Sequence, residues 1–390
     1  MESTNIFQDI PYKSRITPDL RVFSGDDAPL LDEVRQTGVP LIGTHSEVFH
    51  CDEVLATTML LYTHKFQNAA IVRTRNDAVL DTLDIVCDVG AVFDVEKNRF
   101  DHHQKSFNTY WYDSDTAENG GIKLSSAGLI YKYFGKEVLT NILKEVWNSE
   151  FSEPNLEKIY QKLYSGFFQE IDAIDNGVTL AKDMRYRIVT NLSDRISRFN
   201  KEWNAPKDKC QQMQFKKAMR VVEEELMYQI KSISQVFMPA RMIVEEAWAK
   251  KNEFHPSGEI LFMSTPCPWK DHLYELENDN KVGELIKFVL YQDERKMTRV
   301  QTVAPKGNFF AQRVTLCKKW HGLRAQELQL MEAESGLKDL EFVHHSGFIG
   351  GAWSLETAIK MAEQSIADHK AEQEKIKDQQ MIDTEVKVIQ

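Results

Sequence analysis

The sequence predicts an α/β protein with an N-terminal doubly wound parallel sheet and a smaller C-terminal α/β domain. Two observations lead to this prediction. From Val39 onward, short apolar runs rich in β-branched residues alternate with stretches of helical spacing, and buried parallel strands have this composition. A second series of such runs begins only after a long helical region, which separates two parts of the chain.

Three strands are expected in the N-terminal part, with a helix between the first two. The strands are VPLIG at 39–43, AAIVR at 69–73 and DIVCDVG at 84–90, and the helix is DEVLATTMLLYTHK. Ligands of a doubly wound sheet bind at the carboxyl ends of its strands, so functional residues are expected directly after these runs. The chain has neither GxGxxG nor GxxxxGK[ST], which leaves a dinucleotide or P-loop site without support.

Helical patterns dominate from about Ser125 to Ile233, and FKKAMRVVEEELMYQIKSI predicts a long connecting helix. From Ala240, strands are predicted in RMIVEEAW, EILFMST, KFVLYQD, TRVQTVAP and LEFVHHSGFIGG. A final helix with a Ser N-cap is predicted in SLETAIKMAEQSIADHKAEQEKIKDQQ. The expected division is an N-terminal extension (1–36), a first α/β domain (37–200), a helical connector (201–238), a second α/β domain (239–370) and a polar tail (371–390). We expect the active site in the cleft between the two domains.

Composition and charge exclude several classes of protein. The 390 residues include 48 Lys and Arg against 59 Asp and Glu, and the net charge of −11 argues against nonspecific coating of nucleic acid. Five scattered cysteines without a CxxC pair indicate a reducing compartment. No apolar run approaches the ~18 residues that span a bilayer, and the first residues lack signal- or transit-peptide character. We therefore expect no membrane partner and a cytoplasmic or nuclear address, whereas the oligomeric state stays open.

Histidine and aspartate residues cluster in four segments. THSEVFHCDE follows the first predicted strand, DIVCDVG contains an Asp at a strand end, RFDHHQ has an adjacent His pair, and EIDAIDNG carries two Asp residues on a helix. Taken alone, each of these residues could equally serve in a turn, cap a helix or lie in solvent, without any functional role. Buried carboxylates need partners, however, and metal ions are the usual ones. The candidate metal ligands are His45, His50, Asp52, Asp88, His102, Asp172 and Asp175.

The types of these ligands indicate which ions would bind. Mixed imidazole and carboxylate ligands suit Mn²⁺ better than Mg²⁺, which prefers oxygen, or structural Zn²⁺, which prefers thiolates. Mg²⁺ and Co²⁺ stay alternatives. The candidates outnumber what one ion needs, so we expect two divalent cations. Two ions ~3.5–4 Å apart promote in-line displacement at phosphorus.

These motifs resemble those of the DHH phosphoesterase superfamily and, more closely, those of the MYG family, named for a melanocyte-proliferating gene product. The resemblance covers residues 40–363. It is carried by GTHSEVFHCDEVLA (43–56), DIVCDVGAVFD (84–94), RFDHHQ (99–104), EIDAIDNG (170–177), RVQTVAP, KKWHGLR and EFVHHSGFIGG. Members of the family are metal-dependent 3′→5′ exonucleases that act on RNA. The resemblance therefore implies a metal-dependent phosphodiesterase, a 3′→5′ exoribonuclease in which a hydroxide activated by two metal ions attacks phosphorus. It also leaves a mitochondrial address open.

The resemblance further implies roles for single residues. His45, His50 and Asp52 match the first superfamily motif, Asp88 matches the bridging carboxylate of the second, and His102 matches the ligand of the third. The spacing from His45 to Asp52 is one residue longer than in the pyrophosphatase-like branch, so the assignment of His50 is an inference.

Three further expectations come from the same resemblance. His103 would face the phosphate, and Asp101 would orient His102. Either Asp172 or Asp175 would complete one metal shell, and the sequence does not say which. Glu47 stands where the family tends to have a small residue, and we expect its side chain to point to solvent.

A second group of residues is expected to bind substrate. It combines a glycine-rich segment after the predicted strand EFV with nearby arginines, namely His344, His345, Ser346, Gly347, Gly350, Gly351, Arg313 and Arg324. Clustered glycines let a backbone approach a ligand and expose N–H groups to an anion. A plain turn is the alternative. In the stretch 182–220, eleven basic residues against four acidic ones suggest a path for single-stranded RNA, with a solvated helical surface as the alternative.

Two other functions stay open at this stage. The first is a small-molecule phosphohydrolase that cleaves pyrophosphate, a cyclic dinucleotide or a short oligonucleotide. The second is a non-catalytic RNA-binding scaffold, which the full set of candidate ligands disfavours.

Overall fold

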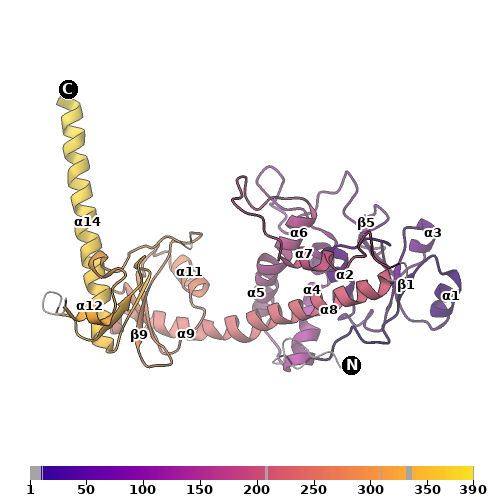
Figure 1. Cartoon of the computed structure of the whole chain (residues 1–390), viewed down its shortest axis with the longest axis horizontal. Helices are drawn as coiled ribbons and strands as arrows, with labels where there is room; N and C mark the ends of the chain where they lie inside the picture. Colours follow the sequence, from indigo (N-terminus) through magenta and orange to yellow (C-terminus); the bar gives the residue numbers. More distant parts are fainter. Residues whose placement is uncertain (1–9, 11, 207–209, 309, 331–335, 390) are drawn as a thin grey trace. The chain divides into compact units, whose positions relative to one another are not determined.

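The computed structural model describes residues 10, 12–206, 210–308, 310–330 and 336–389. It is a mixed α/β structure that divides into two compact units, Met1–Ser234 and Gln235–Gln390. Each unit contains one sheet with helices packed against it (Figure 1).

The first unit contains a six-stranded sheet in which every neighbouring pair is parallel except the last. Its order is β1 (Val22–Ser24), β3 (Ala70–Arg73), β2 (Leu41–Thr44), β4 (Ile85–Cys87), β6 (Arg99–Phe100) and β5 (Phe93–Asp94). The three predicted strands of this part are β2, β3 and β4 at its centre. Ile42 pairs with both Ile71 and Ile85, and all three are fully buried, as expected for a sheet covered on both faces.

Helices of the first unit cover the sheet and carry part of the site. They are α1 (Ala28–Gln36), α2 (Cys51–Leu60), α3 (Asp77–Leu80), α4 (Ser126–Trp147), α5 (Glu153–Leu163), α6 (Gln169–Asp175), α7 (Leu192–Ser197) and α8 (Gln211–Lys231), with a π-helical turn, Tyr164–Phe168, before α6. Every residue of α2 is buried because this helix packs against α4 and α8. Polar residues in its first turn are therefore buried too.

The N-terminal segment is part of the sheet, which differs from the expectation of an extension that ends at residue 36. β1 pairs with β3, and Phe23, Leu31 and Val34 join the core beneath the sheet. Glu223 of α8 holds the chain before β1, because its carboxylate accepts hydrogen bonds from the Ser14 hydroxyl and from the Arg15 N–H at 2.8 Å. The same carboxylate accepts from the Tyr62 hydroxyl, just after α2, at 2.7 Å. The short apolar run at 22–24 was too brief to predict a strand.

The second unit contains a five-stranded sheet in which only β7 and β8 are parallel. Its order is β10 (Leu340–Val343), β11 (Ile349–Ala352), β9 (Thr298–Thr302), β8 (Phe288–Gln292) and β7 (Ile260–Met263). Its helices are α9 (Met238–Ala249), α10 (Lys251–Phe254), α11 (Lys270–Asp279), the 3-10 turn Lys318–Trp320, α12 (Ala325–Leu330) and α14 (Leu355–Ile389). Alternation along β8 sends Phe288 and Leu290 toward α14 and Val289 toward α9 and α11.

Three sequence predictions for the second unit are corrected. RMIVEEAW lies in α9 and is not a strand, because its apolar residues follow helical spacing, and Val244, Ala247 and Trp248 are buried. LEFVHHSGFIGG forms the antiparallel pair β10–β11, so its glycines lie in a hairpin. The polar tail continues α14 to Ile389. Among the described residues, no helix combines the length and apolarity needed to cross a membrane.

The contact between Glu223 and the N-terminal segment gives a first prediction. Glu223→Ala leaves three donors without their acceptor, and we expect the free energy of unfolding to fall by about 2–4 kcal/mol. Urea unfolding of the full chain measures this change. The neighbouring Glu224→Ala should cost less than about 1 kcal/mol. Equal losses in the two variants would show that Glu223 does not hold the N-terminal segment.

Candidate metal centre

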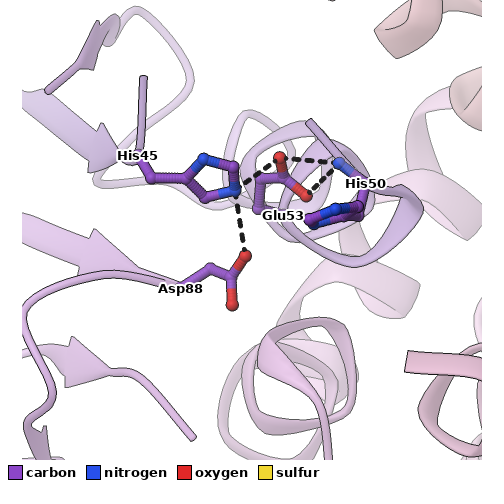
Figure 2. A group of neighbouring side chains, drawn as sticks. All are labelled: His45, His50, Glu53 and Asp88. Carbon is purple, nitrogen blue, oxygen red and sulfur yellow. Dashed lines mark hydrogen bonds and ion pairs between the residues drawn. The ribbon is translucent and has the colours of Figure 1, made fainter. Parts of the chain in front are cut away.

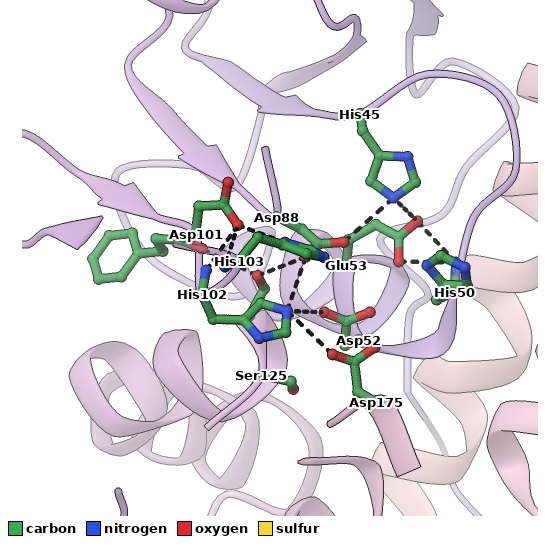
Figure 3. A network of polar contacts seen from close by, with 12 residues as sticks. His45, His50, Asp52, Glu53, Asp88, Asp101, His102, His103, Ser125 and Asp175 are labelled. Carbon is green, nitrogen blue, oxygen red and sulfur yellow. Dashed lines mark hydrogen bonds and ion pairs between the residues drawn. The ribbon is translucent and has the colours of Figure 1, made fainter. Parts of the chain in front are cut away.

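The carboxyl ends of three adjacent parallel strands bring the candidate ligands together. His45 follows β2, Asp88 follows β4, and the pair His102 and His103 follows β6. α2 adds His50, Asp52 and Glu53 at its first turn, and α6 adds Asp175 at its last residue. Figure 3 shows these side chains pointing toward one another from separate elements. Among the described residues, they form three overlapping groups whose ligand atoms lie within 4.8 Å of one another in each group.

The first group consists of His45, His50, Glu53 and Asp88 (Figure 2). The Nε2 atom of His45 lies 3.0 Å from Glu53 Oε1 and 3.3 Å from Asp88 Oδ2. Nδ1 of His45 lies 3.0 Å from the Ser46 carbonyl, which fixes the ring with Nε2 toward the carboxylates. His50 is exposed, and its backbone N–H donates to both carboxylate oxygens of Glu53.

The second group consists of Asp52, His102 and Asp175, and the third consists of Asp88, His102 and His103. Nε2 of His102 lies 3.1 Å from Asp175 Oδ2 and 3.9 Å from Asp52 Oδ2. The same nitrogen lies 3.2 Å from Asp88 Oδ1. Asp88 thus directs one oxygen toward His45 and the other toward His102, which is the position expected of a carboxylate shared by two ions.

Asp88 occupies this position at some conformational cost. Its φ of 62° lies in the left-handed region, which is unfavourable for a residue other than glycine, although aspartate tolerates it better than most. The Ser126 hydroxyl supports the side chain by donating to Asp88 Oδ1 at 3.2 Å. The strained backbone turns the carboxylate toward both histidines directly after β4.

The electrostatics of the cluster fit divalent cations. Both carboxylate oxygens of Asp52 are buried and accept no hydrogen bond within the described part of the chain. Burial, together with the charges of Asp88, Asp175 and Glu53, raises the pKa of Asp52 well above its ordinary value. A buried carboxylate without donors is costly unless a cation compensates it. The donor set is therefore suited to metal ions.

The two buried histidines respond to the same negative potential. Burial alone lowers the pKa of His45, but hydrogen bonds to Asp88 and Glu53 outweigh it and raise the pKa to about 10. For His102, the carboxylates of Asp175 and Asp88 likewise outweigh burial and raise the pKa to about 10. Without metal ions, protons on these rings offset the carboxylate charge. Metal binding would have to displace those protons.

Asp101 orients His103, and this corrects the expectation that it orients the His102 ring. Its Oδ1 atom accepts from the backbone N–H of His102 at 2.7 Å and lies 2.8 Å from Nδ1 of His103. Its Oδ2 atom accepts from the Ala91 N–H at 2.6 Å. The His103 side chain is 62% exposed, so its other nitrogen faces solvent beside the cluster. The hydrogen bond that Nδ1 of His103 donates to the Asp101 carboxylate raises the pKa of His103.

The structure distinguishes Asp172 from Asp175, which the sequence left as alternatives. Asp172 is fully buried, where Oδ1 accepts from the Ser125 N–H at 2.9 Å and hydroxyl at 2.7 Å, and Oδ2 accepts from the Tyr164 hydroxyl. Burial raises the pKa of Asp172 to about 7. These bonds fix the start of α4, whose N-cap is Ser125. Asp175, one turn later, lies with His102 and Asp52 instead.

Sequence reasoning missed two residues at this edge of the sheet. Glu53 follows Asp52 directly, and its spacing of three from His50 is the capping-box pattern that could have drawn attention to it. Arg75 follows β3, is exposed, and places Nη2 3.3 Å from Nδ1 of His45. A cation shortly after a strand, at the edge where a doubly wound sheet binds its ligands, is the signal that could have identified it.

The loop that carries His45 and His50 is fixed by hydrogen bonds that Arg73 and Asn200 form with its backbone. The buried Arg73 donates to the Glu47 carbonyl at 2.8 Å, and its guanidinium lies 4.5 Å from the Phe215 ring centroid. Asn200 accepts from the Phe49 N–H and donates to the Phe49 carbonyl. The Glu47 side chain is exposed, as expected, although its φ of 68° is positive.

The residues predicted to bind substrate in the second unit do not form one cluster. Arg313 is buried and forms a bidentate ion pair with Glu277, with N–O distances of 2.7 and 2.8 Å, which leaves it a structural role. Gly350 and Gly351 lie in β11, where a Cβ would press on Leu316, Met361 and Phe342.

The turn of the β10–β11 hairpin lies at the surface of the second unit, unlike Arg313 and the two glycines of β11. The turn at 344–347 places His344, His345 and Ser346 near the surface, with Gly347 at a φ of 68°. Ser346 Oγ lies 3.0 Å from Nδ1 of His344, and burial, with the positive charge of Arg324 nearby, lowers the pKa of His344. Substrate binding by this turn stays a prediction.

Two basic residues of the stretch 182–220 form hydrogen bonds to the N-terminal segment of the chain. Lys216 donates to the carbonyls of Pro18 and Leu20 at 2.7 and 2.8 Å, and Arg220 donates to the Ile16 carbonyl. Lys207 and Lys209 lie outside the described residues. Lys182, Arg185 and Arg187 lie in an exposed loop before α7. Only part of the stretch is therefore suited to contact RNA, and the predicted path stays untested.

Fold and site together define a class of protein with histidines and carboxylates at the carboxyl edge of a largely parallel sheet, arranged so that they could hold divalent metal ions. Comparison with known proteins gives the family. Residues 41–366 match the family MYG1_exonuc, described as uncharacterised protein family UPF0160. The chain belongs to this family, as its motifs predict.

Three relatives illustrate the extent of the similarity. The chain is 39% identical over 335 residues to the MYG1 exonuclease of Bos taurus, covering 85% of this chain and 86% of the relative. It is 39% identical over 331 residues to the MYG1 exonuclease of Homo sapiens, covering 84% and 86%. It is 36% identical over 341 residues to a MYG1 protein of Saccharomyces cerevisiae, covering 84% and 95%.

The different surroundings of Asp172 and Asp175 give a second prediction. Asp172→Ala leaves the Ser125 and Tyr164 donors unsatisfied, so we expect the free energy of unfolding to fall by about 2–4 kcal/mol. Asp175→Ala removes the repulsion from Asp52 but also the ion pair with His102, so it should destabilise the metal-free protein much less than Asp172→Ala does. It should weaken Mn²⁺ binding tenfold or more, because a lost ligand costs at least as much as a lost partner of a ligand. Urea unfolding with chelator and calorimetric Mn²⁺ titration separate the two effects. A stable Asp172→Ala protein that fails to bind Mn²⁺ would reverse the assignment.

Proposed function

We propose that this protein is a divalent-metal-dependent phosphodiesterase, and specifically a 3′→5′ exoribonuclease. The observation that carries the proposal is the position of Asp88, which directs one oxygen to each of two histidines at the edge of the sheet. Two ligand groups that share one carboxylate are the arrangement used for in-line displacement at phosphorus. The exonuclease names of the bovine and human relatives support nucleic acid as the substrate.

The ligands divide into two sets around Asp88. His45, His50 and Glu53 would hold one cation, and Asp52, His102 and Asp175 would hold the other. When bound, divalent cations supply Lewis acidity at the phosphate and lower the pKa of water. Mn²⁺ suits the mixture of nitrogen and oxygen donors.

Residues next to the ligands would handle the phosphate. His103 is exposed and oriented by Asp101, so its ring can donate a hydrogen bond to a phosphoryl oxygen. Arg75 lies on the opposite side of His45 from the carboxylates, at its Nδ1, and can neutralise phosphate charge at the same edge.

The proposal is tested by hydrolysis with purified protein. We expect Mn²⁺-dependent shortening of 5′-labelled single-stranded RNA from its 3′ end, measured beside DNA, pyrophosphate and cyclic dinucleotides with Mn²⁺, Mg²⁺ and Co²⁺. The variant Asp88→Ala/His102→Ala should lose activity by at least about 10³-fold, because it removes the shared ligand and one histidine. Undiminished cleavage by this variant would show that the activity arises elsewhere. Preferred hydrolysis of pyrophosphate would favour the small-molecule alternative.

The pair Asp101 and His103 gives a further prediction for the same reaction. His103→Ala should lower kcat by about 10²-fold, since it removes a donor to developing charge. Asp101→Asn should lower kcat by about tenfold, and the double variant should resemble His103→Ala, because Asp101 acts through His103. Steady-state kinetics and Mn²⁺ titration of each variant provide the test. A loss of Mn²⁺ affinity in His103→Ala would instead identify His103 as a metal ligand.

A further inference from the structure

A cavity of ≈370 Å³ opens beside the metal centre within the first unit. Asp52, Asp175 and His103 of the metal centre line one part of it. A molecule that occupies the cavity therefore lies within reach of a phosphate held at the cluster.

The rest of the lining is uncharged except for one carboxylate. α6 contributes Ile171 and Ile174, three residues apart and therefore on one side of the helix. The N-terminal part of α7 contributes Ser193 and Asp194, preceded by its N-cap Asn191. Among the described residues that line the cavity, none is Lys or Arg. Away from the metal centre, a second phosphate or a polyphosphate chain would meet the Asp194 carboxylate and no cation, so this part of the cavity suits a neutral group.

We propose that this cavity binds the 3′-terminal nucleoside of an RNA strand and that Asp194 recognises its ribose hydroxyls. This inference rests on the proposed phosphodiesterase function and adds the sugar that the site selects. A nucleoside has a flat base with apolar faces and a sugar with hydroxyl donors. The two isoleucines match the base, and the polar start of α7 matches the sugar.

Asp194 is held in position to accept from the sugar. Its backbone N–H donates to Asn191 Oδ1 at 2.8 Å, and its Oδ2 atom accepts from Asn191 Nδ2 at 2.9 Å. No hydrogen bond to its Oδ1 atom occurs in the described part of the chain, and the residue is half-buried. A fixed carboxylate with one unused oxygen is suited to ribose hydroxyls, as in dinucleotide-binding folds.

Strand polarity follows from the same chemistry. The 3′-terminal ribose of RNA carries adjacent free 2′ and 3′ hydroxyls, whereas an internal ribose has its 3′ oxygen esterified. With the terminal nucleoside in the cavity, its 5′ phosphate lies toward Asp52 and Asp175, where the bond to the rest of the strand would be cleaved. Recognition of the diol therefore favours removal of one ribonucleotide at a time from the 3′ end.

The experiment compares RNA strands that differ only in the terminal sugar. We expect the Mn²⁺-loaded full chain to cleave a strand ending in ribose with a kcat/KM about tenfold to a hundredfold higher than one ending in 2′-deoxyribose. Asp194→Asn should lower kcat/KM for the ribose-ended strand by a similar factor, chiefly through KM, and should affect the deoxyribose-ended strand much less, because that strand offers Asp194 only the 3′ hydroxyl. The matched control is Asp77→Asn, which lies in the first turn of α3 behind an Asn N-cap and outside the cavity. It should retain the full preference.

A second variant examines the apolar wall. Ile174→Ala should raise KM for both strands by the same factor, because the base is common to them. A sugar-dependent effect of Ile174→Ala would contradict the assignment of base and sugar within the cavity.

Calorimetric binding of adenosine 5′-monophosphate and its 2′-deoxy form separates this inference from the proposed function. Tighter binding of the ribose form by wild type, and equal binding of both forms by Asp194→Asn, supports the cavity even if no strand is cleaved. If RNA is cleaved but neither kinetics nor binding depends on the terminal sugar, the cavity assignment is wrong and the phosphodiesterase stands. Unchanged thermal unfolding and Mn²⁺ affinity of Asp194→Asn establish that the variant is intact.

Discussion

Four carboxylates, Asp52, Glu53, Asp88 and Asp175, converge with His45 and His102 at one edge of a sheet. Their mutual repulsion in a site with little water is the constraint on which this half of the molecule depends. The raised pKa values of Asp52 and of both histidines show how strongly the site favours added positive charge. The surrounding elements keep these groups together against that repulsion.

The scaffold does so by burying the elements that carry the ligands. α2 is buried along its whole length between α4 and α8, so Asp52 and Glu53 cannot turn toward solvent. Arg73 and Asn200 fix the loop before α2, and Asp172 fixes the start of α4. Because these supports lie behind the candidate ligands, the fold sets the geometry of the cluster.

The sequence was informative where patterns are local. Three central strands followed from apolar runs, and His45 and Asp88 were identified directly after two of them because parallel strands end at a common edge. His102 was identified from the adjacent His pair in RFDHHQ. Glu53 was missed because its neighbour Asp52 already satisfied the expected motif. The choice between Asp172 and Asp175 depends on which side chain Ser125 and Tyr164 reach, and contacts so distant in sequence leave no local pattern. RMIVEEAW was wrongly predicted to be a strand because its β-branched residues favoured that assignment over its helical spacing. The packing of α9 in the structure shows that the helical spacing was decisive.

The pairing of β1 with β3 also bears on how the chain tolerates shortening. A protein trimmed at residue 37, where the first sheet was expected to start, would lose its outermost strand. β3 would then become an edge with unpaired backbone groups, and its residues Ala70, Ile71 and Val72 are apolar and buried. Exposed apolar edges pair readily with other chains. Insolubility of such a fragment would therefore result from the loss of the strand that protects this edge, although all the candidate metal ligands would still be present.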